Sequence, residues 1–157
     1  MSSRQNGAVQ VSLVEVSDTT ALIRRASCAH RDLGPAIGRL FGEIIAGNPE
    51  AELEDAPRVY YREWTPDHCE IEVALPVGPH VGPAAGTSIK NYPACSALCA
   101  EHLGPYDSLH ESWLRLYAFA QEEGVQPNGY PWDSYVVGPI DQPDRSLWVT
   151  ELYLPIG

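Results

Sequence analysis

The sequence predicts an α+β protein built from two β-β-α-β-β repeats, and three observations carry this prediction. Residues 148–157 alternate between apolar and other side chains and end in Pro-Ile-Gly, which is typical of a strand. The phrase 151–157 nearly repeats the phrase 72–78, with an offset of 151 − 72 = 79 residues. A Leu-Gly-Pro sequence precedes a helical pattern in each half, at Pro35 and at Pro105. We therefore expect two pseudo-twofold-related repeats that form an antiparallel sheet or barrel with two main helices.

The first repeat is predicted to span about residues 9–78. Strands have alternating or β-branched patterns, and the helix has apolar residues at three- and four-residue spacing. The expected elements are strands over 9–16 and 19–25, a helix over 33–47, and strands over 57–64 and 68–77. The dipeptide Ser17-Asp18 is interpreted as a turn that pairs the first two strands as a hairpin.

The second repeat is predicted to span residues 87–157, after a linker over 79–86 that is rich in Pro and Gly. Its expected elements are strands over 87–92 and 94–102, a helix that follows 102–106 and ends at Glu123-Gly124, and strands over 131–135 and 148–157. Together the repeats make a single domain over 1–157, which is long enough to bury a substantial core.

The composition is strongly acidic, with 10 Lys and Arg against 21 Asp and Glu and a formal net charge of −11. This charge argues against direct nucleic-acid binding and favours cations or neutral molecules as ligands, although an acidic surface would also suit a basic protein partner. No apolar run is long enough to cross a bilayer, and the first residues do not form a signal peptide. We therefore expect a cytoplasmic protein that does not bind membranes.

The four cysteines, Cys28, Cys69, Cys95 and Cys99, show no Cys-x-x-Cys spacing. We interpret them as small apolar residues in a reducing compartment; a metal site or a redox pair is the alternative. No set of ligands with metal-binding spacing accompanies them, so we predict no metal.

The alternation of the last strand assigns its side chains to two faces. One face carries Trp148, Thr150, Leu152 and Leu154, and the other carries Val149, Glu151 and Tyr153. We expect the first face to pack under a helix, as Val73 and Leu75 do in the first repeat. Glu151 and its repeat mate Glu72 then point the other way, into a cleft that the two repeats share.

Several stretches of the second half carry a family resemblance. They are 102–106, the helix with Trp113 and Leu116, 131–135, 141–144 and 148–155. These stretches resemble the GyrI-like small-molecule-binding domain, which is also the effector-binding domain of AraC-type and MerR-type multidrug-responsive regulators and has a SOUL-like fold. The resemblance covers roughly residues 9–157 and is looser in the first half.

The resemblance implies a two-repeat α+β domain whose central cavity is lined by aromatic residues and holds a buried acidic residue that faces lipophilic cations. Glu151 occupies the place of that acidic residue. No helix-turn-helix precedes the domain, so we expect a stand-alone member that is not by itself a DNA-binding regulator. A SOUL-type haem site is disfavoured, because no histidine can be placed on the cleft face, and no cofactor is predicted.

A carboxylate among aromatic rings suits a flat, weakly hydrated cation. The candidate ligand-binding residues are Glu151, Tyr135, Tyr153, Tyr61, Trp132, Trp64 and Glu72. A buried carboxylate needs a hydrogen bond or a raised pKa, and Tyr135 is the first candidate donor to Glu151, followed by Tyr153 and Tyr61. Trp132 and Trp64 have strand parity opposite to that of Tyr135 and Tyr61, unless a bulge intervenes.

Binding or sequestration of lipophilic, aromatic and often cationic molecules is therefore the predicted function. One alternative is a hydrolase of electrophilic cyclopropanoid toxins, known in the same family, in which Glu151 activates water and Tyr135 donates a proton. Another is a module that inhibits or buffers a protein partner such as DNA gyrase. A homodimer also remains open.

Overall fold

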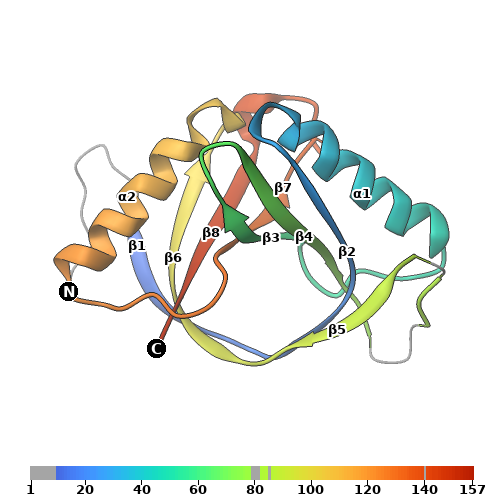
Figure 1. Ribbon diagram of the computed structural model, residues 1–157, viewed down its shortest axis with the longest axis horizontal. Helices are drawn as coiled ribbons and strands as arrows, with labels where there is room; N and C mark the ends of the chain where they lie inside the picture. Colours follow the sequence, from blue (N-terminus) through green and yellow to red (C-terminus); the bar gives the residue numbers. More distant parts are fainter. Residues whose placement is uncertain (1–9, 79–81, 85, 140) are drawn as a thin grey trace. The chain divides into compact units, whose positions relative to one another are not determined.

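The chain divides into two compact units in a computed structural model that describes residues 10–78, 82–84, 86–139 and 141–157 (Figure 1). Unit 2 is Asp18–Pro93, and unit 1 joins the segment that ends at Ser17 to Ala94–Gly157. Each unit contains four antiparallel strands and one main helix within the described residues, so the predicted α+β class is confirmed.

The strands of unit 2 are hydrogen-bonded in the order β3-β4-β2-β5, and the unit has one main helix. Its elements are β2 (Thr19–Ala29), α1 (Leu33–Gly47), β3 (Arg58–Trp64), β4 (His68–Pro76) and β5 (Ser88–Tyr92). Helix α1 packs on β2 and β4. Its buried residues Ala36, Leu40 and Ile44 recur every four positions, which places them on one face.

Unit 1 repeats this arrangement in the order β1-β6-β8-β7. Its elements are β1 (Val11–Val16), β6 (Cys95–Leu103), α2 (Leu109–Glu122), β7 (Trp132–Val137) and β8 (Val149–Ile156). Helix α2 lies along β6 and also contacts β8 (Figure 1). Leu152 and Leu154 of β8 share a core cluster with Leu116 and Phe119 of α2, so the predicted apolar face of the last strand does pack under a helix.

The predicted hairpin between the first two strands is wrong. Strand β1 pairs with β6, from Val11 opposite Ala100 to Val16 opposite Cys95. Strand β2 instead pairs with β4 and β5. Each unit therefore takes one outer strand from the other sequence repeat, a choice that local turn signals do not reveal.

Some predictions fall on residues that the structure does not describe. These are Val9, the predicted start of the first strand, and 79–81 and 85 of the predicted linker. Within the described residues, no helix combines the length and the apolar character that a membrane span requires.

Candidate functional site

Each sheet has one face toward its helix and one face away from it, which we call the helix-free face. In unit 2, Arg24 of β2 reaches Glu43 of α1 at 3.1 Å, so Arg24 lies on the helix side. Its register partner Val73 lies on the same side. Arg25 and Glu72, which pair one position further along, therefore lie on the helix-free face.

The same reasoning fixes the faces of unit 1. His102 of β6 lies 2.8 Å from the hydroxyl of Ser112 in α2, and His102 pairs with Thr150 of β8. Thr150 is thus on the helix side, and Glu151 and Tyr153 are on the helix-free face. The strand parity read from the sequence is confirmed for the last strand.

Glu151 lies beside a pair of stacked aromatic rings. The Tyr153 hydroxyl donates to Glu151 Oε1 at 2.8 Å. Trp132 of β7, which pairs with Tyr153, stacks on the Tyr153 ring at 4.8 Å with an interplanar angle of 11°. Burial and the bond to Glu151 raise the pKa of Tyr153, so this phenol remains a donor. The half-buried carboxylate thus has an aromatic wall on its own face.

The charged residue that pairs with Glu151 in the strand register is also acidic. Glu101 of β6 stands directly opposite Glu151 in the register, and both side chains are on the helix-free face. Within the described residues, no Lys or Arg forms an ion pair with Glu151. Burial, followed by the nearby charge of Glu151, raises the pKa of the Cys99 thiol to about 11. Two carboxylates side by side create a negative electrostatic potential, and a bound cation would reduce the repulsion between them.

Glu72, the repeat mate of Glu151, has the opposite surroundings. It is 1% exposed and is neutralised by cations. Arg25 Nε donates to Oε1 at 2.6 Å, Lys90 Nζ donates to Oε2 at 2.9 Å, and Arg62 lies 3.7 Å away. The Tyr92 hydroxyl also donates to Oε2. Burial alone would raise the pKa of Glu72, but the bonds from Tyr92, Lys90 and Arg25 outweigh it and hold that pKa below its usual value.

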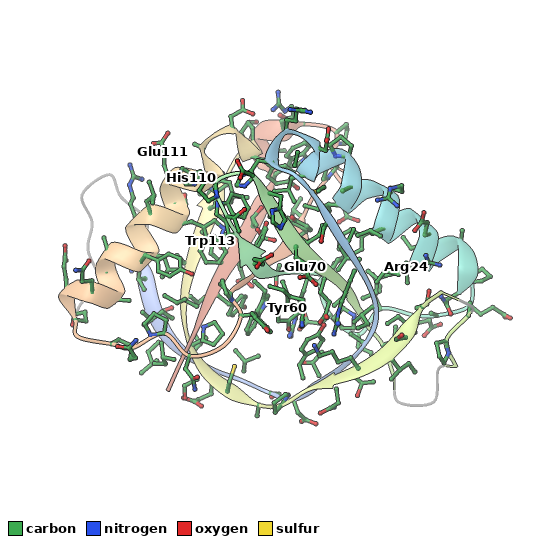
Figure 2. All side chains as sticks on the ribbon, in the orientation of Figure 1. Arg24, Tyr60, Glu70, His110, Glu111 and Trp113 are labelled. Atoms are coloured by element: carbon green, nitrogen blue, oxygen red, sulfur yellow. The ribbon has the colours of Figure 1, made fainter. Side chains whose placement is uncertain are left out.

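The network around Glu72 extends over the helix-free face of unit 2. Tyr60 stacks on Tyr92 at 4.3 Å, with an interplanar angle of 6°. Arg58 Nη1 donates to the Tyr60 hydroxyl at 2.9 Å, and Arg62 pairs with Glu70 at 3.7 Å. Tyr60 and Glu70, labelled in Figure 2, come from the adjacent strands β3 and β4. Glu72 is thus the centre of an ion-pair network, and its carboxylate is already paired with Arg25, Lys90 and Arg62.

The prediction that a tyrosine bonds to Glu151 is confirmed, but the first choice of tyrosine is wrong. Tyr135 pairs with Thr150 and therefore lies on the helix side of β7, where its ring is 5.7 Å from that of Tyr106. Tyr153, the second choice, is the donor. A shift of one position along a strand moves every side chain to the opposite face. Sequence alone does not define the register of β7 against β8, and this explains the wrong choice of Tyr135.

The faces on which Tyr61 and Trp64 lie also differ from the prediction. Tyr61 pairs with Ile71 and lies on the helix side of unit 2. A register shift between Tyr61 and Glu63 brings Trp64 to the same side, where its ring is 5.9 Å from that of Tyr61. Trp64 is 52% exposed. Neither ring is on the face that carries Glu72.

Sequence reasoning missed the partners of Glu72 and the acidic neighbour of Glu151. Lys90 and Tyr92 are two positions apart on β5, so their shared face could have been inferred. Their partner strand could not, because the strand over 87–92 is assigned to the second repeat, whereas β5 pairs with β2 of the first. Across the described ranges, no three His, Cys, Asp or Glu side chains come together as a possible metal site.

Comparisons with known proteins agree with this architecture. A family model described as the GyrI-like small molecule binding domain matches residues 9–157. The crystal structure of the EcmrR C-terminal domain is similar with a TM-score of 0.81 and 24% identity, over 95% of this chain and 98% of that one. In the EcmrR–DNA complex, this chain matches 57% of the EcmrR chain, with a TM-score of 0.84 and 22% identity.

Two more distant structures share the fold. SAV2435 bound to tetraphenylphosphonium is similar with a TM-score of 0.73 and 10% identity, over 94% of each chain. A hydrolase from Listeria innocua is similar with a TM-score of 0.61 and 13% identity, over 94% of this chain and 91% of that one. No curated protein sequence matches the chain significantly.

Proposed function

Since the chain belongs to the GyrI-like small-molecule-binding domain family, we propose that its unit 1 binds lipophilic aromatic cations at Glu151. One observation carries the proposal. The Glu151 carboxylate faces Glu101 across the strand pair and lies beside the Trp132–Tyr153 stack, with no Lys or Arg of the described residues paired to it. SAV2435, which shares the fold, binds tetraphenylphosphonium, a ligand of this chemical class.

The physical basis is the balance between desolvation and attraction. A large aromatic cation is weakly hydrated, so it loses little on leaving water. The electron-rich ring of the partly exposed Tyr153, which stacks on the buried Trp132, attracts it. The charge of Glu151, reinforced by Glu101, adds a Coulomb attraction that the half-buried position strengthens over its value in bulk water. The Tyr153 hydroxyl holds the carboxylate in one orientation.

The test is a fluorescence titration with tetraphenylphosphonium, and tetraphenylborate serves as a control of the same shape and opposite charge. We expect Glu151→Gln to weaken binding of the cation about 10-fold or more, equivalent to about 1.4 kcal/mol. Glu101→Gln should weaken it less, since Glu101 is exposed. Glu70→Gln, on the helix-free face of unit 2, is the matched control and should leave the affinity unchanged. Equal binding by the parent and Glu151→Gln, or equal affinity for the two ions, would overturn the proposal.

Hydrolysis is the second candidate function. The hydrogen bond from Tyr153 to Glu151 favours Tyr153, and not Tyr135, as the proton donor of such a hydrolase. Glu151 would take a proton from a water molecule while the water oxygen bonds to a ring carbon and the ring C–C bond breaks. Tyr153, which its raised pKa keeps protonated, would give a proton to the oxyanion or carbanion that this cleavage forms, and Glu151 would return its proton to Tyr153. The test is product formation from an electrophilic cyclopropane, followed by mass spectrometry. A hydrolase should lose turnover in Glu151→Gln and in Tyr153→Phe; a parent protein that returns every such compound unchanged eliminates this candidate.

A further inference from the structure

Two thiols of unit 2 are in contact across neighbouring strands. Cys28 of β2 and Cys69 of β4 are direct register partners, and their Sγ atoms are 4.0 Å apart. Both are free thiols. Cys28 is partly exposed, whereas Cys69 has 0% exposure and lies next to Trp64, its register partner on β3.

The backbone already has the geometry that a disulfide needs. Residues directly opposite each other on antiparallel strands have Cα atoms about 4.5–5.5 Å apart, and disulfides accept about 4.4–6.8 Å. Closing the sulfurs from 4.0 Å to about 2 Å therefore requires rotation of the side chains and no change of register. The other two cysteines, Cys95 and Cys99, are four positions apart on the same strand, about 13 Å along it, and cannot close in this way.

We propose that Cys28 and Cys69 form a reversible dithiol–disulfide site that is oxidised by low-molecular-weight disulfides of the glutathione type. The Cys28 thiolate attacks one sulfur of oxidised glutathione, forms a mixed disulfide and expels one glutathione thiolate. Cys69 then loses its proton, attacks the Cys28 sulfur and expels the second glutathione. Two protein thiols are oxidised to one disulfide, and one oxidised glutathione is reduced to two thiols.

The environment sets the order of these two steps. Cys28 reaches solvent and meets the oxidant first. Burial, followed by the proximity of Cys28, raises the pKa of the Cys69 thiol to about 11, so Cys69 is a slow nucleophile toward reagents in solution. It reacts because the Cys28 sulfur is already in contact with it, which replaces a bimolecular encounter by an intramolecular one.

The disulfide would tie together the two strands that hold the Glu72 network. Arg25 and Glu72 are register partners on the same strand pair, three positions from Cys28 and Cys69 (28 − 25 = 3 and 72 − 69 = 3). The two cysteines are separated by 41 positions in the sequence, so the link restricts the unfolded chain substantially. We expect the oxidised protein to melt about 5 °C or more above the reduced protein.

The test equilibrates the full chain in glutathione buffers of defined ratio, alkylates the remaining thiols, and maps the peptides by mass spectrometry. The expected product is a peptide pair linked through Cys28 and Cys69, reversed by a phosphine reductant, with Cys95 and Cys99 alkylated. Cys69→Ser should stop at one stable glutathione adduct on Cys28. The variant that lacks Cys95 and Cys99, both replaced by Ser, should form the same link as the parent.

Two results would overturn the proposal. One is a parent protein that carries glutathione adducts without the linked peptide at any buffer ratio. The other is an oxidised protein whose disulfide joins other cysteines and whose melting temperature equals that of the reduced protein. Because the parent protein alone gives the decisive peptide map, the test does not depend on whether Cys69→Ser folds.

Discussion

Glu72 and Glu151 occupy matching positions on β4 and β8, each on the helix-free face of its own unit, but among the described residues Lys and Arg side chains pair with Glu72 and not with Glu151. Arg25 and Lys90 each bond to one oxygen of Glu72. Glu151 bonds to the neutral hydroxyl of Tyr153. One position of the repeat is thus the centre of an ion-pair network in unit 2, and the other is the carboxylate that the proposed cation would meet in unit 1.

The first prediction concerns the ion pairs of Glu72. We expect Glu72→Gln to lower the free energy of unfolding at pH 7 by about 2 kcal/mol, because it weakens buried hydrogen bonds to a charged group. The folded-state pKa of Glu72 is lowered, so its contribution is present above the unfolded pKa of about 4.3 and is lost as the pH falls through the folded value. Urea unfolding of parent and variant between pH 7 and pH 3 should show curves that converge in acid.

A matched control is Glu70→Gln, which removes a longer and more exposed ion pair on the same strand. Its effect should remain within about 1 kcal/mol. A Glu72→Gln variant that is as stable as the parent at pH 7, or equally destabilised at both ends of the pH range, contradicts the role assigned to this network.

The second prediction concerns Tyr92 and Tyr153, whose pKa values are raised, first by burial and then by their bonds to carboxylates. A group with a raised folded-state pKa stabilises the protein fully below its unfolded pKa, about 10 for tyrosine, and less as the pH rises above it. The free energy of unfolding should therefore fall above about pH 10. Tyr92→Phe and Tyr153→Phe should each reduce that slope, measured by urea unfolding between pH 8 and pH 11.

Phenolate absorbance offers an independent reading of the same two residues. In the parent, both phenols should ionise only together with alkaline unfolding, which circular dichroism follows in parallel. Tyr130→Phe, at a position 46% exposed, is the control for removal of a single hydroxyl. If Tyr92→Phe and Tyr153→Phe leave the alkaline slope as steep as in the parent, the raised pKa values are not coupled to folding.

The third prediction concerns Gly86, just before β5. Gly86 has φ +82°, and an added Cβ would lie 2.8 Å from the guanidinium of Arg24. Arg24 bonds to Thr87 and to Glu43, so it positions the start of the strand that carries Lys90. We expect Gly86→Ala to destabilise the protein by about 1–3 kcal/mol, measured by urea unfolding. Gly82→Ala, where nothing lies within 4 Å of the new Cβ, should stay within about 0.5 kcal/mol of the parent.

Local patterns were enough to predict the elements and the faces of the last strand. The alternation over 148–157 correctly separated Leu152 and Leu154, which pack on α2, from Glu151 and Tyr153, which do not. This works because a strand has a fixed period of two, whatever its partners are. The two-repeat pattern likewise anticipated the matching order of strands and helix in the two units.

The partners of the strands could not be predicted in the same way. Arg25 and Lys90 meet Glu72 because β2 pairs with both β4 and β5, and this pairing joins segments that are far apart in the sequence. Register shifts in β3 and β7 likewise depend on the neighbouring strand. The sequence pointed to Tyr135 as the donor, whereas the pairing of Tyr135 with Thr150 of β8 places Tyr135 on the other face.

The exchange of outer strands has a consequence for the order of folding. Val16 and Cys95 pair in β1–β6 although 95 − 16 − 1 = 78 residues separate them, and closing such a loop costs about 4 kcal/mol of chain entropy. Thr19 and Tyr92, three residues inside these positions, pair in β2–β5. Once unit 2 has folded, its two ends are already adjacent, so β1 can pair with β6 almost as it would in a short hairpin.

We therefore expect pulsed hydrogen exchange to show protection of the amides of β2 and β5 before those of β1. Protection of β1 first would exclude this order. Folding of unit 2 would then precede the pairing of β1 with β6 in the discontinuous unit 1. A mutation that slows β2–β5 pairing would therefore delay folding of the whole chain.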